Sequence, residues 1–429
     1  MKRLLMLVLT LCLVTGGMAT AEDGSDALRI LDGWRVNHFQ EMYPDHNVQE
    51  IKVVYDDDGF GNKAELLMSG DWDVAYFHET EYDLAKLAEA VPLLDLSTEA
   101  VYAQKLSQIY PNVQEAVTKN DQMLALPVWL DAAVMQMEYV GTVITREGEM
   151  IDLGEQLGIA ADEIPTTFSE LCDLGVKYMA LPRETRKGTS FNAFITEQAS
   201  NDSKHFYLDY LVELYASEVV GENGVVNFDT PLFRTSLEDL DRLHTALKSD
   251  PKRTYGEKRT LYSVVTDAST GFLQDDILHL RVADGEQIPA RLGVLVINAN
   301  TKHKAEALDY LEFLSSEFMM QFGPVIYEVF DYDAAVRQTY DLTIEAQQTQ
   351  EEEQSVIDEL IRMRDAGDTS RFYSLELIDA YRQNIAPNLT FHVIPRPYTY
   401  NMTKDYAYGK VTADELVEKL NAAYQDAMK

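Results

Sequence analysis

The segment 291–316 combines a short strand, a polar turn and an amphipathic helix. Leu292–Ile297 is a nearly continuous apolar run rich in Val and Ile, which predicts a buried strand. Asn298, Asn300 and Thr301 follow, and these residue types favour turns and helix N-caps. Beyond them, apolar residues recur at helical spacing with acidic residues between them. A chain built around such a strand–turn–helix unit is expected to be an α/β protein.

Length and charge limit the classes of protein that this chain can represent. With 429 residues and an apolar fraction of 46%, the chain is long enough for two domains with sizeable cores. Its 36 basic and 72 acidic residues give a net charge of −36. Such a balance opposes binding to nucleic acid or to anionic membranes, and it favours solubility. No nucleic-acid partner is therefore expected.

The first residues, Met1–Ala21, have the pattern of a secretory signal peptide. Lys2 and Arg3 are basic, Leu4–Val14 is apolar but too short to span a bilayer, and Ala19–Ala21 is a small-x-small cleavage site. No later segment is apolar for long enough to cross a membrane. The sequence thus predicts an exported protein, periplasmic or extracellular, that is soluble after cleavage of the signal peptide.

The two cysteines predict a mature protein with neither a lipid anchor nor a disulfide. Cys12 follows Leu11 inside the apolar core rather than a small residue near its end, and only Cys172 remains after cleavage. Mass spectrometry of the exported protein is expected to show an N-terminus at or near Glu22. A diacylglyceryl-modified cysteine would contradict this prediction.

The N-terminal hundred residues alternate short strands with helices. Ala27–Tyr43 places Leu28, Leu31 and Trp34 on one helical face, yet 27–31 fits a first strand equally well. Other apolar patterns predict strands at 48–55 and 73–77 and helices at 64–68 and 84–90.

Several short motifs occur in an order that is typical of one protein family. Thr167 or Ser169 is expected to cap the helix that follows, and Thr412 with Glu415 predicts a capping box. The motifs are the segments 43–48, 69–76, 92–97, 121–128, 157–171, 227–231, 291–316 and 409–416. Together with the signal peptide, these segments make the chain resemble the extracellular solute-binding proteins of ABC importers, family 1, the maltose/oligosaccharide-binding type.

The resemblance implies a two-lobe periplasmic-binding-protein type II fold. In that fold each lobe is a mixed sheet flanked by helices, and the ligand lies in a cleft between the lobes. The implied divisions are lobe 1 at 27–130 and 294–328, lobe 2 at 133–290 and 332–429, and hinge crossings near 131, 292 and 330.

The same resemblance implies where the ligand binds. Strand ends of open sheets carry ligand contacts, which points to Phe77, His78 and Glu79 after one strand and to Trp129 and Asp131 at the hinge. Aromatic rings stack on sugar rings, and carboxylates accept hydrogen bonds from hydroxyl pairs. The aromatic residues could equally be core residues, and the acids could lie in plain surface loops. The remaining candidate is Trp34, whose helical spacing also fits a core position.

No catalytic motif and no metal-ligand spacing occurs in the sequence, so neither an enzyme, a cofactor nor a metal is expected. The resemblance implies a monomer that captures a small solute, a sugar or oligosaccharide first of all, and delivers it to ABC transporter permease subunits. Three alternatives remain open at this stage. They are a binder of polyamines or other cations, a secreted carbohydrate-active enzyme, and a cell-surface module without a small ligand.

Overall fold

The protein is represented by a computed structural model, which describes most of the chain. The described residues are 26–54, 61–79, 82–132, 135–139, 142–144, 150–158, 165–186, 189–192, 201–220, 224–248, 259–264, 273, 277–282, 287–317, 319–349, 354–394 and 397–427. The predicted signal peptide and Cys12 lie outside these ranges. Among the described helices, none is both long and apolar enough to cross a membrane.

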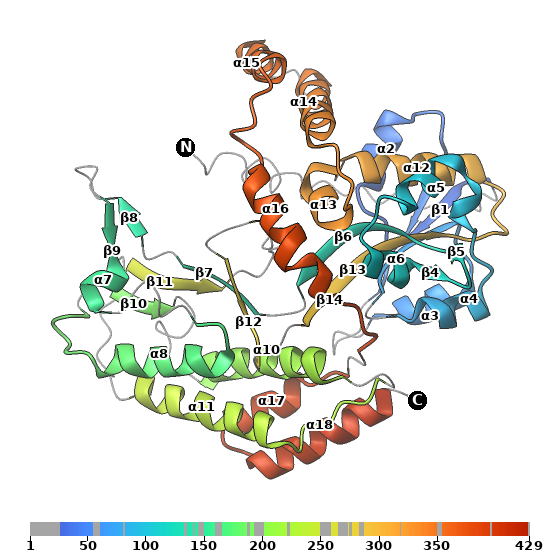
Figure 1. Ribbon diagram of the computed structural model, residues 1–429. Helices are drawn as coiled ribbons and strands as arrows, with labels where there is room; N and C mark the ends of the chain where they lie inside the picture. Colours follow the sequence, from blue (N-terminus) through green and yellow to red (C-terminus); the bar gives the residue numbers. More distant parts are fainter. Residues whose placement is uncertain are drawn as a thin grey trace.

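The larger of two main sheets is mixed and carries strands from both ends of the chain (Figure 1). Its order is β14-β13-β3-β1-β2, and β6 also pairs with β13. The parallel pairs are β1 with β2, β1 with β3 and β13 with β14, whereas β13 runs antiparallel to β3 and β6. Its strands are β1 (Leu28–Leu31), β2 (Val48–Ile51), β3 (Val74–His78), β6 (Leu126–Ala132), β13 (Ile288–Ile297) and β14 (Leu389–Thr390).

The structure resolves the ambiguity at the N-terminal end in favour of a strand. β1 takes residues 28–31, and the helix begins only at Val36. Leu28, Ile30 and Leu31 are almost fully buried because β1 lies inside the sheet, between β2 and β3. Over so few residues, a helix and a buried strand give similar patterns of apolar residues. Here the pairing of residues 28–31 with β2 and β3 selects the strand.

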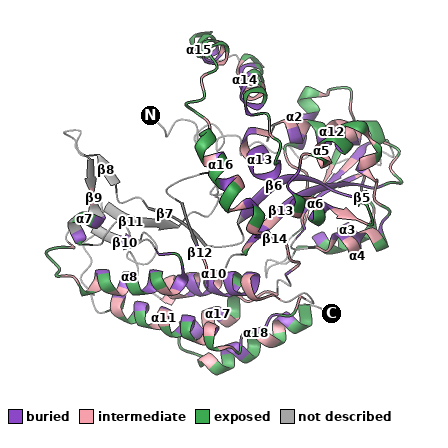
Figure 2. Ribbon diagram, viewed as in Figure 1, coloured by how far each residue is buried: buried purple, intermediate pink, exposed green. Residues whose placement is uncertain are grey.

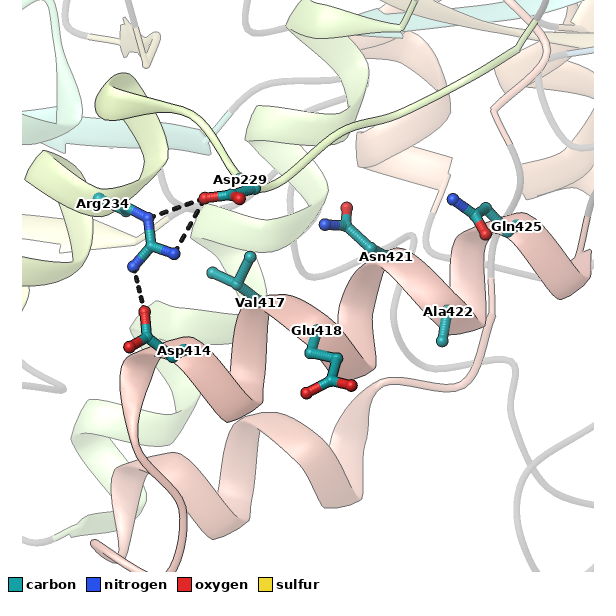
Figure 3. A pocket seen from close by; sticks show the side chains of 8 residues that line it. All are labelled: Asp229, Arg234, Asp414, Val417, Glu418, Asn421, Ala422 and Gln425. Carbon is teal, nitrogen blue, oxygen red and sulfur yellow. Dashed lines mark hydrogen bonds and ion pairs between the residues drawn. The ribbon is translucent and has the colours of Figure 1, made fainter.

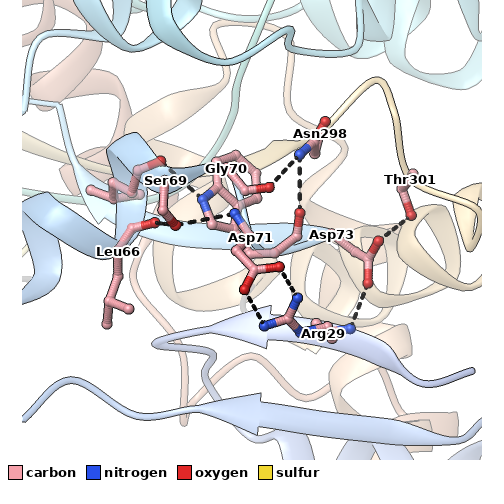
Figure 4. Close-up of polar contacts among 10 residues, drawn as sticks. Arg29, Leu66, Ser69, Gly70, Asp71, Asp73, Asn298 and Thr301 are labelled. Carbon is pink, nitrogen blue, oxygen red and sulfur yellow. Dashed lines mark hydrogen bonds and ion pairs between the residues drawn. The ribbon is translucent and has the colours of Figure 1, made fainter. Parts of the chain in front are cut away.

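A polar clamp joins the start of β3 to the turn after β13 (Figure 4). The Asp73 carboxylate accepts hydrogen bonds from the Arg29 backbone N–H at 2.7 Å and from the Thr301 hydroxyl at 2.5 Å. The Asn298 amide donates to the carbonyls of Gly70 at 2.9 Å and Trp72 at 3.2 Å. The segments 69–76 and 291–316 therefore meet in space, and the polar residues of this clamp have a structural role.

Helices from distant parts of the sequence pack on this sheet and share its core, which we call lobe 1. They are α2 (Val36–Met42), α3 (Lys63–Ser69), α4 (Leu84–Ala90), α5 (Ala100–Leu106), α6 (Pro111–Val117), α12 (Lys304–Glu317), α13 (Met319–Ile326), α14 (Tyr332–Thr349), α15 (Gln354–Asp365) and α16 (Leu375–Asn384), with short 3₁₀ turns at Leu96–Thr98 and Ala386–Asn388 and a hairpin of β4 (Thr118–Lys119) and β5 (Gln122–Met123). The helix at Lys304–Glu317 confirms the predicted strand–turn–helix unit.

The packing of residues 332–349 and 354–389 corrects one predicted boundary. Their buried side chains belong to the core of lobe 1, not to that of lobe 2 as the sequence analysis expected. The Tyr381 hydroxyl donates to the Val325 carbonyl of α13 at 2.8 Å, which fixes α16 against lobe 1. The apolar spacing of these helices shows that one face is buried, but it does not show which lobe covers that face.

A second, separate core defines what we call lobe 2 (Figure 2). Its four-stranded sheet has the order β10-β11-β7-β12. Its elements are β7 (Met135–Tyr139), β8 (Thr142–Ile144), β9 (Met150–Asp152), β10 (Thr189–Asn192), β11 (Arg259–Val264), β12 (Ile277–Leu280), α7 (Leu153–Leu157), α8 (Phe168–Ala180), α10 (Asn201–Val219), α11 (Pro231–Lys248), α17 (Tyr400–Ala407) and α18 (Ala413–Ala427).

Two helix starts in lobe 2 follow the sequence prediction. Thr167 caps α8 in a capping box with Glu170. At α18 the Thr412 hydroxyl accepts a hydrogen bond from the Glu415 N–H at 3.3 Å, and the Glu415 carboxylate accepts one from the Thr412 N–H at 2.7 Å. Both capping predictions are confirmed, because a cap depends on residues that are close in sequence.

Candidate functional site

Strand β3 sends alternate side chains to opposite faces of the larger sheet. Phe77 is fully buried, and its ring contacts Tyr82 edge-on at 6.1 Å. Tyr76 and His78 point to the other face, where their rings lie 5.6 Å apart. Phe77 is therefore a core residue of lobe 1 and does not share a face with His78, which corrects its place among the predicted ligand residues.

Four rings on this face form a continuous series that we call the aromatic row: Trp34, Tyr76, His78 and Trp129. Trp34 stacks on Tyr76 with ring centroids 5.3 Å apart and an angle of 23° between the planes. His78 contacts Trp129 edge-on at 4.8 Å. Trp34 and His78 remain half-buried, whereas Tyr76 and Trp129 are only 4% and 9% exposed. In the aromatic row, the rings of Trp34 and His78 are therefore partly exposed to solvent, whereas those of Tyr76 and Trp129 are buried.

Charged groups flank the aromatic row, and Arg291 and Lys63 each pair with a carboxylate. The Arg291 guanidinium lies 5.7 Å from the Trp129 ring and forms an ion pair with buried Asp131 at 2.7 Å. At the other end, the Lys63 ammonium lies 5.4 Å from the Tyr76 ring and pairs with Asp32. The face therefore offers rings and paired charges rather than a net positive field.

Gly293 lets the strands of the aromatic row approach one another. It pairs with His78 on β3 and with Trp129 on β6, at a point where the register of the β13–β6 pair shifts. A Cβ atom at this position would lie 2.5 Å from the Tyr76 hydroxyl and 3.0 Å from the Trp129 Cβ. The absence of a side chain here makes room for both rings, since contacts this short are not tolerated in a packed core.

Glu79 follows β3 but belongs to a different environment. Its side chain is buried, and its Oε2 has no hydrogen-bond partner among the described residues. Burial raises the pKa of Glu79 to about 7, with Lys119 opposing the shift and Asp83 adding to it. The charges that act on Glu79 thus come from β4 and from the start of α4, and not from Arg291 beside the aromatic row.

A surface hollow in lobe 2 has no aromatic ring in its lining, in contrast to the aromatic row of lobe 1 (Figure 3). It lies between the start of α11 and α18 in lobe 2, and Arg234 on its wall bonds to Asp229 at 3.0 Å and to Asp414 at 2.6 Å. It is lined by Asp229, Arg234, Asp414, Val417, Glu418, Asn421, Ala422 and Gln425. With no aromatic ring in this lining, the hollow is a polar surface groove, and the aromatic row is the stronger candidate site.

The structure thus brings four of the six predicted residues together and separates two. Trp34, His78, Trp129 and Asp131 share the face of the aromatic row, whereas Phe77 and Glu79 do not. The sequence analysis missed Tyr76, Lys63 and Arg291. Tyr76 could have been found from the two-residue period that links it to His78, but no local signal marks Lys63 or Arg291.

Comparison with known proteins supports the fold. No known protein family and no curated protein matches the sequence. Among solved structures, the chain is similar to one from work on xylan utilization by Caldanaerobius polysaccharolyticus, at 15% identity and a TM-score of 0.51, over 92% of this chain and 99% of that one. It is similar to maltose-bound T. maritima MalE3, at 16% identity and a TM-score of 0.51, over 93% and 99% of the two chains.

A third similar structure is an ABC transporter solute-binding protein from Thermotoga lettingae with bound alpha-D-tagatose. Here the identity is 15% and the TM-score 0.50, over 94% of this chain and the whole of the other. The protein therefore has the two-lobe α/β fold of these solute-binding proteins, in agreement with the fold predicted from the sequence.

Proposed function

We propose that the protein is an exported solute-binding protein that captures a sugar or oligosaccharide and delivers it to the permease of an ABC transporter. The observation that carries the proposal is the aromatic row of lobe 1, on a fold whose solved examples bind maltose and tagatose. The protein acts as a binder without catalysis, and it works as a monomer that closes on its ligand.

The chemistry of the aromatic row suits a polyhydroxyl ligand. The half-buried Trp34 ring offers a surface on which the C–H face of a sugar ring can stack. Asp32 and Asp131 at the two ends supply carboxylates, which accept strong hydrogen bonds from hydroxyl groups. A ligand that closes both lobes over this face also removes water from it, which strengthens these hydrogen bonds.

The paired charges favour an uncharged sugar over an acidic one. Arg291 and Lys63 are each neutralised by a neighbouring carboxylate, so an anionic ligand would meet Asp131 or Asp32 beside either cation. Like charges brought together in a partly desolvated site repel strongly. A polyamine, the cationic ligand considered in the sequence analysis, would not be repelled by these carboxylates. Spermidine is therefore included in the test.

Sugar binding is expected to raise the melting temperature of the protein. A ligand at 100 times its Kd stabilises the folded state by about 2.7 kcal/mol, which corresponds to roughly 5–10 °C for lobes of this size. The measurement is a thermal-shift series with maltose, xylotriose, tagatose and cycloalternan, and with spermidine. A shift with spermidine alone would favour the cationic alternative, and no shift with any of these compounds would contradict the proposal.

Tryptophan fluorescence provides a second measurement at the site itself. The chain has three tryptophans, and the one outside the aromatic row, Trp72, is buried with its indole N–H bonded to the Leu67 carbonyl at 3.0 Å. The emission change on sugar binding should therefore come from Trp34 and Trp129. It is expected to diminish in Trp34→Phe and to persist in Trp72→Phe.

A further inference from the structure

The short turn between β1 and α2, residues 32–35, carries Trp34 and has an unusual backbone conformation; we call it the Trp34 turn. Asp32 and Arg35, which begin and end it, have φ angles of 51° and 52°. These angles lie in the left-handed region, which residues other than glycine rarely adopt because the Cβ atom crowds the following carbonyl oxygen. Two such residues in one turn persist only where the surrounding structure fixes them, and such positions are common where ligands bind.

Two helices of lobe 1 fix the Trp34 turn. Tyr310 on α12 donates a hydrogen bond from its hydroxyl to the Trp34 carbonyl at 2.7 Å, although the two residues are far apart in the sequence. At the start of α3, the Lys63 ammonium forms an ion pair with the Asp32 carboxylate. The turn is therefore held at two points, by its main chain at Trp34 and by its side chain at Asp32.

Gly33 allows the turn to pack directly against Tyr310. A Cβ atom at Gly33 would lie 2.8 Å from the Tyr310 hydroxyl and 2.7 Å from the Val36 Cγ2 atom, and it would also overlap the Ile30 side chain. Contacts this short are not tolerated in a packed core, so the absence of a side chain makes room for the hydroxyl. The close packing also leaves the turn no space in which to shift towards α12.

Tyr310 itself is out of reach of a ligand. It is 0% exposed, and its ring packs edge-on against Phe39 of α2 at 5.1 Å in the core of lobe 1. Trp34, by contrast, is half-buried and stacks on Tyr76 in the aromatic row. Any effect of the Tyr310 hydroxyl on a bound sugar must therefore pass through the Trp34 turn.

We propose that Tyr310 is a positioning residue of the sugar site, whose hydroxyl holds the Trp34 ring in its stacking orientation before the ligand arrives. This inference rests on the proposed function. A turn that is already ordered in its binding conformation loses little conformational entropy on binding, so its fixed conformation adds to the affinity. The inference also accounts for the two left-handed residues, which hold Trp34 between two fixed ends.

The test is Tyr310→Phe, which removes the hydroxyl and keeps the ring. Calorimetry with maltose, xylotriose, tagatose and cycloalternan is expected to show about 3- to 10-fold weaker binding of each sugar that binds the wild type, because the turn then spends part of its time in conformations that do not present Trp34. The matched control is Tyr381→Phe, which removes a buried hydroxyl that donates to the Val325 carbonyl of the same lobe at 2.8 Å. It should lower stability to a similar degree and leave the affinity unchanged.

Two further measurements show whether Tyr310 acts through Trp34. In a Trp34→Ala background, Tyr310→Phe should cause no further loss of affinity, since the ring that it positions is gone. The chain has three tryptophans, so replacing Trp72 and Trp129 with Phe leaves Trp34 as the source of the emission. In that protein without sugar, Tyr310→Phe should lower the fluorescence anisotropy, because the Trp34 ring moves more freely. A purely structural role of Tyr310 in the core would leave this anisotropy unchanged.

The outcomes separate this inference from the function on which it rests. An affinity of Tyr310→Phe equal to that of the wild type, or an equal loss with and without Trp34, overturns the positioning role and leaves the solute-binding function standing. If no sugar binds the wild type, the proposed function fails, and the anisotropy of the free protein still shows whether the hydroxyl holds Trp34. If Tyr310→Phe does not fold, the protein with Trp34 as its one tryptophan decides the matter: a large rise in its anisotropy on adding sugar would mean that the ligand orders the ring, and would overturn the inference.

Discussion

Replacing Glu79 with Gln is expected to make the protein more stable at pH 8 by about 3 kcal/mol while leaving its stability at pH 4.5 nearly unchanged. The reason is the burial of the Glu79 carboxyl, which raises its pKa from the ordinary 4.5 to about 7. Gln has the same shape and carries no charge, so the folded protein no longer has to hold a buried carboxylate at high pH.

The sign of the pH dependence follows from which state keeps the proton. Between pH 4.5 and about 7 the folded protein keeps the Glu79 proton while the unfolded chain has lost it. Stability therefore falls as the pH rises through this window, and the full loss is present above it. Below this pH window the Glu79 carboxyl is protonated in both the folded and the unfolded protein, so it does not make the free energy of unfolding depend on pH there.

The measurement is urea unfolding of the wild type and Glu79→Gln at several pH values from 4.5 to 8. The control is Glu89→Gln on neighbouring α4, where an exposed carboxyl is replaced in the same way and little change is expected. Parallel pH profiles for the wild type and Glu79→Gln would show that the carboxyl is not held protonated in the folded protein.

Trp129→Ala is expected to lower the free energy of unfolding by about 3–5 kcal/mol and to weaken sugar binding by about 10-fold. The Trp129 ring is 9% exposed and contacts His78, Phe322 and the Arg291 guanidinium, so its loss leaves a cavity behind the aromatic row. His78 and Arg291 then lose the ring surface against which they pack in the proposed binding site.

A second buried tryptophan separates the effect on binding from the effect on stability. Trp72 is 3% exposed and lies outside the aromatic row, so Trp72→Ala should destabilise the protein to a similar degree without changing the affinity. Urea unfolding and calorimetry on both variants provide the comparison. If either alanine variant does not fold, the two Trp→Phe variants replace them. Equal affinities for the variants at 129 and 72 would remove Trp129 from the binding site.

Much of the local structure could be predicted because it depends on neighbouring residues. The apolar run at 292–297 and the helical spacing after it were sufficient for the strand and helix of this unit, and Thr167 and Thr412 cap the helices that follow them. The two-lobe fold also agreed with the fold that the family resemblance implied, which rested on the order of several short motifs along the chain.

The tertiary structure alone decided which faces meet. The pattern of β3 marks Phe77 as apolar and aromatic, but only the packing on both sides of the sheet places it in the core and Tyr76 in the aromatic row. Likewise, the apolar spacing within 332–349 and 354–389 did not reveal that the buried side chains of these segments belong to the core of lobe 1. The physical reason is that backbone periods are local, whereas burial, ion pairs such as Arg291–Asp131 and the raised pKa of Glu79 depend on residues brought together from distant parts of the chain.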